Sequence, residues 1–260
     1  NVGGAGGTLG AGQVAEAEPD GYTLLVHHIG MSTAPTLYRS LPYDPLTDFT
    51  PIGLITEVPM TIIARKDFGP TTLEEFVAYV KENGDQVTYG NAGIGAASHL
   101  CGMLLMEAIG TQMTTVPYQG TGPMMTDLLG GQIDTSCDQT TNTTNQILAG
   151  EVKAYAVTVP ARLGNLPDLP TTAEAGLPNL EVSVWHGLYG PAGMPEDVVT
   201  KLTAALQAAL ADETVASRFA ELGTTPVAQE DATPAALTET LTSQIEVWRP
   251  VIEAAGTFAD

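Results

Sequence analysis

The spacing of apolar and polar residues divides the chain into short helices and strands. The clearest helix begins at Thr72, because Thr72-Leu-Glu-Glu75 has the spacing of a capping box and apolar residues follow at helical intervals. Asn83-Gly84 is a typical stop for such a helix. Similar signals predict further helices at 8–18, from Ser98, at 123–130, 138–150, 195–210 and 213–222, and from Thr233, the last burying Leu237, Leu241, Ile245, Trp248 and Ile252.

Apolar runs between these helices are predicted to be strands, at 22–27, 58–64, 87–89, 133–137, 153–158 and 182–189. Strands that alternate with helices are typical of α/β folds with mainly parallel sheets. The long extended runs at 58–64 and 182–189 enclose the middle of the chain, so two crossings between two lobes are expected. We therefore predict a two-lobed α/β fold with lobe 1 at 1–61 and 184–260, lobe 2 at 62–183, and a ligand cleft at the hinge.

Composition is compatible with this fold and narrows the possible partners. The chain has 260 residues, more than one core usually organises, and 43% of them are hydrophobic. Thirty Asp and Glu against nine Lys and Arg give a formal net charge of −21, which repels nucleic-acid phosphates. No basic cluster is present to bind an anionic membrane surface. We expect no nucleic-acid partner, and we expect the surplus negative charge to favour a monomer.

Metal and cofactor sites have recognisable residue patterns, and none is found here. The four histidines lack zinc-site spacing and have no acidic cluster beside them, so no metal is expected. The nucleotide-binding patterns GxGxxG and GxxxxGK[ST] are missing, so no cofactor is expected. Cys101 and Cys137 lack CxxC spacing; two buried thiols are the simplest interpretation, and a disulfide stays open.

An enzyme is the alternative to a binding protein. A small-molecule hydrolase or isomerase would use Ser98 with His99, or Asp138. Adjacent residues face different directions on a helix, so Ser98 and His99 are poorly placed as a dyad. No G-x-S-x-G turn is present to expose a nucleophile. The missing motifs favour a binding protein.

The loop Asn91-Ala-Gly-Ile-Gly-Ala-Ala-Ser98 has the chemistry to bind an anion without arginine. A helix begins in it, helix N-termini expose unpaired amides, and glycine lets a ligand approach the backbone closely. Asp138-Gln139 follow a strand end, where open α/β sheets bind ligands, and Trp185 is a candidate wall of the cleft. The alternatives are an ordinary turn with a Ser cap, an N-cap role for Asp138, and hinge packing for Trp185. The candidate contacts of this loop are Asn91, Gly93, Gly95, Ala96, Ala97, Ser98 and His99.

Short motifs occur in a fixed order along nearly the whole chain. In the N-terminal half they include Gly4-Ala-Gly-Gly7, Pro19-Asp-Gly-Tyr-Thr-Leu-Leu25, Leu41-Pro-Tyr-Asp-Pro45, Asn91-Ala-Gly-x-Gly95, Val116-Pro-Tyr-x-Gly120 and Asp127-Leu-Leu-Gly-Gly-Gln132. In the C-terminal half they include Leu166-Pro-Asp-Leu-Pro-Thr171, Glu174-Ala-Gly-Leu-Pro178 and Gly190-Pro-Ala-Gly193. Through these motifs the chain resembles the extracytoplasmic solute-binding receptors of the tripartite tricarboxylate transporter family, the TctC or Bug type.

The resemblance implies a type II periplasmic-binding-protein fold that closes on a small mono- or dicarboxylate, aliphatic or aromatic. It implies a periplasmic location and delivery of the ligand to a membrane permease. It also implies contacts from the 91–99 loop, from Asp138, and from the strand end that contains His28 and Gly30. It implies a hydroxyl residue as the usual choice where Ala96 or Ala97 stands in this chain, so fewer side-chain donors are expected here. The family's first strand, glycine-rich anion loop and first helix, like a signal peptide, would precede Asn1.

Overall fold

The computed structural model describes residues 2–256, 258 and 259, which form two compact units. Unit 1 comprises Asn1–Glu57, Trp185–Phe219 and Thr225–Asp260, and unit 2 comprises Val58–Val184 and Ala220–Thr224. The short segment Ala220–Thr224 thus belongs to unit 2, although the residues on either side of it in the sequence belong to unit 1. The two units are described separately below.

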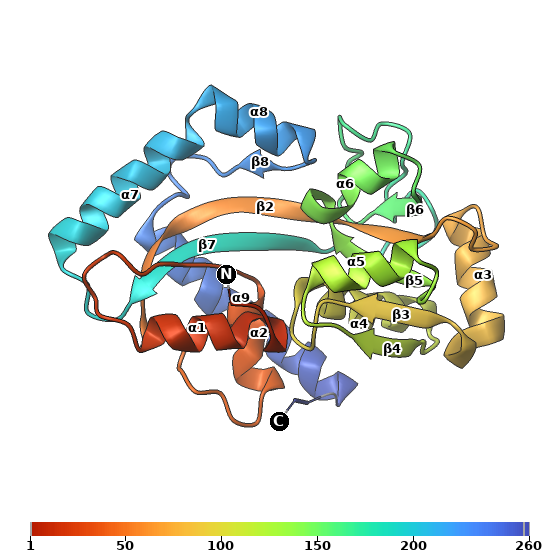
Figure 1. Cartoon of the computed structure of the whole chain (residues 1–260), viewed down its shortest axis with the longest axis horizontal. Helices are drawn as coiled ribbons and strands as arrows, with labels where there is room; N and C mark the ends of the chain where they lie inside the picture. Colours follow the sequence, from red (N-terminus) through yellow and green to blue (C-terminus); the bar gives the residue numbers. More distant parts are fainter. Residues whose placement is uncertain (1, 257, 260) are drawn as a thin grey trace. The chain divides into compact units, whose positions relative to one another are not determined.

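Unit 1 contains one part of the β-sheet. Strand β1 (Leu25–His28) pairs antiparallel with β7 (Ser183–Pro191), and β7 in turn lies next to β2 (Phe49–Arg65). The short strand β8 (Thr225–Pro226) pairs antiparallel with the unit 1 part of β2. β2 is the long curved strand of Figure 1 that begins in unit 1 and ends in unit 2.

Most helices of unit 1 bury apolar residues, but the helix Glu213–Glu221 has no buried residue. They are α1 (Thr8–Ala15), preceded by the 3-10 turn η1 (Ala5–Gly7), then α2 (Gly30–Leu37), α7 (Glu196–Leu210), α8 (Glu213–Glu221), which ends in unit 2, and α9 (Pro234–Ala255). Helix α9 packs against α2, and the Thr233 hydroxyl caps it by accepting a hydrogen bond from the Ala236 amide. The prediction of its buried face is confirmed for Leu237, Leu241, Ile245, Trp248 and Ile252.

Unit 2 is built on a mixed sheet. Besides the end of β2, its strands are β3 (Thr88–Asn91), β4 (Thr114–Pro117), β5 (Thr135–Gln139) and β6 (Val152–Val157). β3 is parallel to both β4 and β5, whereas β2 is antiparallel to β5 and β6. The expectation of mainly parallel sheets is therefore wrong. The reason is that β2 runs against its unit 2 neighbours, a direction that periodicity does not specify.

Helices connect these strands and cover the sheet of unit 2 (Figure 1). They are α3 (Leu73–Asn83), followed by the 3-10 turn η2 (Gly84–Gln86), then α4 (Ala97–Ile109), α5 (Thr121–Leu129) and α6 (Thr140–Leu148). The predicted helix from Thr72 is confirmed, because the Thr72 hydroxyl accepts a hydrogen bond from the Glu75 amide at 3.2 Å. The Glu75 carboxylate accepts from the amide and hydroxyl of Thr71, one residue earlier than the predicted box required.

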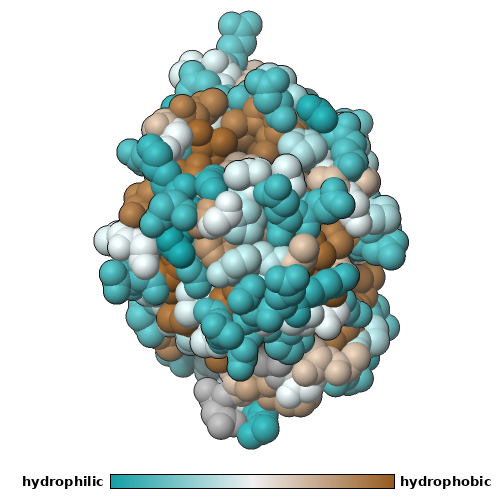
Figure 2. Space-filling model, turned by 90° about the vertical axis from the view of Figure 1, so that its right-hand side faces the viewer, coloured by the Kyte–Doolittle hydropathy of each residue, from teal (hydrophilic) through white to brown (hydrophobic). Residues whose placement is uncertain are grey.

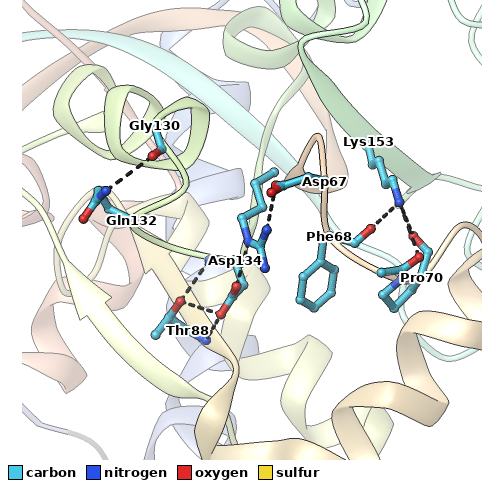
Figure 3. A network of polar contacts seen from close by, with 10 residues as sticks. Asp67, Phe68, Pro70, Thr88, Gly130, Gln132, Asp134 and Lys153 are labelled. Carbon is cyan, nitrogen blue, oxygen red and sulfur yellow. Dashed lines mark hydrogen bonds and ion pairs between the residues drawn. The ribbon is translucent and has the colours of Figure 1, made fainter.

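A polar network joins the strands of unit 2 where β3 begins (Figure 3). Asp134 accepts a hydrogen bond from Nε of Arg65 at 2.9 Å through Oδ1. Its Oδ2 accepts from the amide and the hydroxyl of Thr88 at 2.9 and 2.8 Å. Arg65 also pairs with Asp67 at 2.6 Å, and Lys153 donates to backbone carbonyls between β2 and α3. These contacts hold β2, β3 and β5 together at the edge where β3 starts.

The surface of unit 2 includes a groove of about 800 Å³ whose lining includes residues of α3 and β6. Its polar lining includes the carboxylates of Glu74, Asp168 and Glu174, which makes it a poor place for an anion. Figure 2 shows the face of the molecule that lies on the right of Figure 1, where polar residues surround separate apolar patches. Among the residues that the structure describes, no helix combines the length and apolar character that a bilayer span requires.

Candidate functional site

Two segments singled out from the sequence leave the sheet of unit 2 at the same edge. β3 and β5 are parallel, with Tyr89 opposite Thr135, so their carboxyl ends point the same way. Asn91 ends β3, and Asp138 lies near the end of β5. The loop that links β3 to α4 (residues 92–96, here called the β3–α4 loop) therefore starts beside Asp138. This edge is where open α/β sheets usually bind ligands.

Two hydrogen bonds fix the conformation of the β3–α4 loop. The side-chain oxygen of Asn91 accepts from the amide of Gly93 at 2.9 Å, and the Ala92 amide donates to Oγ of Ser98 at 2.9 Å. Gly93 and Gly95 have φ of +117° and +84°, a backbone region that residues with a Cβ rarely adopt. The two glycines thus allow the chain to turn directly from a strand into a helix.

Helix α4 starts at this loop with no side-chain cap. Its N-cap is Ala96, and no side chain bonds to its first turn as a cap. The first-turn amides of Ala97 and Ser98 have no acceptor within the helix, as at any helix N-terminus. The predicted start of the helix at Ser98 is one residue late, and the alternative in which Ser98 only caps the helix is wrong. The helix begins at Ala97, and the Ser98 hydroxyl faces back to the loop amide of Ala92. A bare N-terminus of this kind attracts an anion.

His99 is neutral in the folded protein. Its side chain is 6% exposed, and burial lowers the pKa of His99 to about 4. Nδ1 accepts a hydrogen bond from the Gly95 amide at 3.3 Å, so in the neutral ring the proton is on Nε2. His99 therefore offers a hydrogen-bond donor but no positive charge.

Asp138 is a buried carboxylate with several donors around it. Oδ1 accepts from the Gln139 amide at 2.7 Å and from Nδ2 of Asn142 at 3.1 Å, and Oδ2 accepts from the Thr121 hydroxyl at 3.1 Å. Burial raises the pKa of Asp138, and the three hydrogen bonds oppose this rise. Asp138 does not cap α6, whose N-cap is Gln139. It instead ties the end of β5 to the start of α5.

Thr121 and Asn142 were not predicted as parts of this site. Asn142 follows Asp138 by four residues, the spacing of neighbours on a helix, and this signal was available in the sequence. Thr121 comes from a different helix, and only the fold brings it to Asp138. Two buried polar atoms at this edge have no partner among the described residues, namely Nδ2 of Asn91 and Oε1 of Gln139. A bound ligand or water is the usual partner of such atoms.

Ser98 and His99 do not form a nucleophile with its base. The Ser98 hydroxyl accepts from Ala92, and Nδ1 of His99 accepts from Gly95, so both side chains serve the loop backbone. A catalytic dyad requires a hydrogen bond from the serine to the histidine base. The geometry therefore favours binding over the hydrolase alternative.

The remaining predicted residues, His28, Gly30 and Trp185, lie in unit 1. Nδ1 of His28 accepts from the Gly30 amide at 2.9 Å, and a Cβ on Gly30 would lie 2.9 Å from the His28 ring. His28 pairs with His186 across β1 and β7, and burial lowers the pKa of His28 well below its usual value. Trp185 is 6% exposed, and its indole nitrogen has no partner among the described residues.

Cys101 and Cys137 form a disulfide with a Cα–Cα distance of 5.9 Å. The interpretation as two buried thiols is wrong, because the fold brings α4 beside β5 and so places residues distant in sequence within bonding distance. Within the described part of the chain, no three His, Cys, Asp or Glu side chains are grouped as metal ligands.

The sequence matches a known family over nearly its whole length. The family described as "Tripartite tricarboxylate transporter family receptor" matches residues 1–257. The chain belongs to this family. One relative of the receptor is an Agrobacterium vitis protein encoded in the TAR-I ttuE-ttuC' intergenic region. It is 56% identical over 256 residues, which cover 98% of this chain and 74% of the relative.

Solved structures of other proteins also superpose on the receptor over most of its length. The periplasmic binding protein BugD superposes with a TM-score of 0.96 at 52% identity, covering 99% of this chain and 86% of that chain. MatC from Rhodopseudomonas palustris, solved with bound malate, superposes with a TM-score of 0.91 at 41% identity, covering 96% and 85%. The receptor has the periplasmic-binding-protein fold of the TctC/Bug type, which confirms the predicted fold class.

Proposed function

We propose that this receptor binds the carboxylate of a small mono- or dicarboxylate at the N-terminus of α4. The observation that carries the proposal is the uncapped first turn of α4, reached through Gly93 and Gly95. The chain has no lysine or arginine between Lys81 and Lys153, so no cationic side chain from this stretch competes with the backbone amides. The negative charge of an anion held there would be stabilised by the helix dipole and by hydrogen bonds from the amides.

Neutral side chains would complete the site. Among the residues that the structure describes, Nδ2 of Asn91 is a buried donor without a partner, and His99 presents a neutral imidazole with its proton on Nε2. Ala96 and Ala97 add no hydroxyl donors, so backbone amides carry more of the binding than they would beside a serine or threonine there. We infer that discrimination among carboxylates rests on Asn91, Gln139 and the Asp138 network rather than on an arginine.

The malate bound by MatC supports this ligand class. We further propose that the protein works in the periplasm as a monomer and delivers its ligand unchanged to a membrane permease. The two compact units would then be the lobes predicted from the sequence, with His28, Gly30 and Trp185 as the contribution of the first lobe.

Calorimetry with matched ligands tests the proposal. Malate and related dicarboxylates should bind and raise the unfolding temperature, because a ligand that binds only the folded state stabilises it. Malamide has the same shape without the charge, and it should bind far more weakly. Equal affinity for acid and amide would contradict anion recognition. Recovery of a chemically altered ligand, detected by mass spectrometry, would favour an enzyme instead.

A further inference from the structure

The hydroxyl of Tyr89 joins two elements of the candidate site. Tyr89 lies on β3 and is fully buried. Its hydroxyl donates to the carbonyl of Ser98 at 2.6 Å and accepts from the amide of Cys137 at 3.1 Å. One phenol thus links the first turn of α4 to the backbone of β5, one residue before Asp138.

The disulfide links the same two elements by a covalent bond. Cys101 lies one helical turn after Ser98, and Cys137 is the residue whose amide donates to Tyr89. Gly102 lets α4 approach this closely, because a Cβ there would lie 2.4 Å from the Tyr89 ring. The hydrogen bonds and the disulfide therefore act on one contact between α4 and β5.

We propose that Tyr89 and the Cys101–Cys137 disulfide are positioning groups that hold the first turn of α4 at a fixed place relative to Asp138. The inference rests on the proposed carboxylate site. Backbone amides cannot change rotamer to reach a ligand. Whether the α4 amides bind a carboxylate therefore depends on the position of the whole helix. Binding sites usually need placement within about 0.5 Å, which supporting contacts provide. A helix held before the ligand arrives also loses less entropy on binding.

Tyr89→Phe is the main test, because it keeps the ring packed on Gly102 and removes every hydrogen bond of the Tyr89 hydroxyl. Tyr155→Phe is the matched control, since Tyr155 is also buried in unit 2 and its hydroxyl donates at 3.1 Å to the carbonyl of Pro70, which belongs to neither α4 nor β5. A Cys101→Ala/Cys137→Ala variant tests the covalent link. Carboxylate affinity is measured by calorimetry on folded samples. Hydrogen exchange of a peptide covering residues 92–100 is measured without ligand.

We expect Tyr89→Phe and the double cysteine variant each to lose about ten-fold or more in affinity, with faster exchange over residues 92–100. Tyr155→Phe should lose stability with affinity within about two-fold of wild type. If the cysteine variant does not fold, Tyr89→Phe decides alone. Wild-type affinity together with wild-type exchange in Tyr89→Phe would overturn the inference and leave the carboxylate site standing. Failure of the wild type to bind any carboxylate would overturn the proposed function, and this inference with it.

Discussion

The backbone amide of Gly95 donates a hydrogen bond to Nδ1 of His99, 3.3 Å away. This contact links the β3–α4 loop to the first turn of α4. It also selects the tautomer of the neutral histidine that carries its proton on Nε2. It requires Gly95 to stay at a φ of +84°, where a side chain is strained. This one hydrogen bond thus joins the loop to the helix and decides which ring nitrogen of the neutral His99 carries the proton.

Gly95→Val should therefore abolish carboxylate binding while the protein stays folded. The valine would be strained at this φ and would occupy the space through which a ligand reaches the α4 amides. The control is Gly110→Val at the other end of α4, where φ is +75° and a Cβ would meet no atom within 4 Å. Both variants should lose about 1–2 kcal/mol of stability, but only Gly95→Val should lose affinity in calorimetry. Normal affinity in a folded Gly95→Val variant would mean that the anion binds somewhere other than this loop.

Arginine should contribute to stability rather than to binding. Arg65 is engaged by Asp134 and Asp67 at the edge where β3 begins, opposite the end that carries Asn91. Arg65→Gln should lower the free energy of unfolding by about 1–3 kcal/mol and leave affinity within a few-fold. Arg162→Gln, which breaks a more exposed pair with Glu174, should cost less than about 1 kcal/mol. A large loss of affinity from either change would mean that an arginine contacts the ligand, and it would contradict a site made of backbone amides.

Stability should fall as the pH drops from 6.5 towards 4. Burial is the main reason that the pKa values of His27 and His99 are lowered to about 4, so the unfolded chain binds protons in this range and the folded protein does not. Each histidine should remove about 3 kcal/mol from the free energy of unfolding across this window. Denaturant unfolding at several pH values measures the slope, and His99→Asn should make it shallower. An identical slope in that variant would show that His99 does not contribute.

Thr121→Val should destabilise the protein most at neutral pH. The Thr121 hydroxyl donates to Asp138, and its loss removes a contact that favours the ionised carboxylate. We expect a loss of about 1 kcal/mol at pH 7 that shrinks as the pH falls and Asp138 becomes protonated. Thr121→Ser should restore the wild-type profile, because it keeps the donor. A loss independent of pH would instead indicate that Thr121 acts through packing.

The α3 and α9 helices follow from local information. The Thr72 cap and the apolar stripe of α9 are written within a few consecutive turns, so spacing alone predicts them. The β3–α4 loop is equally local, because paired glycines between a strand and a helix specify an open turn. The family follows from an ordered set of short motifs that extends over most of the chain. The sequence by itself therefore determined the fold class, these elements and the candidate anion loop.

Only the tertiary structure decided which of these pieces meet. The direction of β2 against β5, the disulfide between Cys101 and Cys137, and the donation from Thr121 to Asp138 all join residues from different elements. The contact of the Ser98 hydroxyl was also decided by the tertiary structure, since the loop returns towards α4 and brings the Ala92 amide to this hydroxyl. Periodicity records which face of an element is buried, but it does not record the partner that buries it. Partners are selected by packing of the whole unit, where many weak contacts between distant segments are satisfied together.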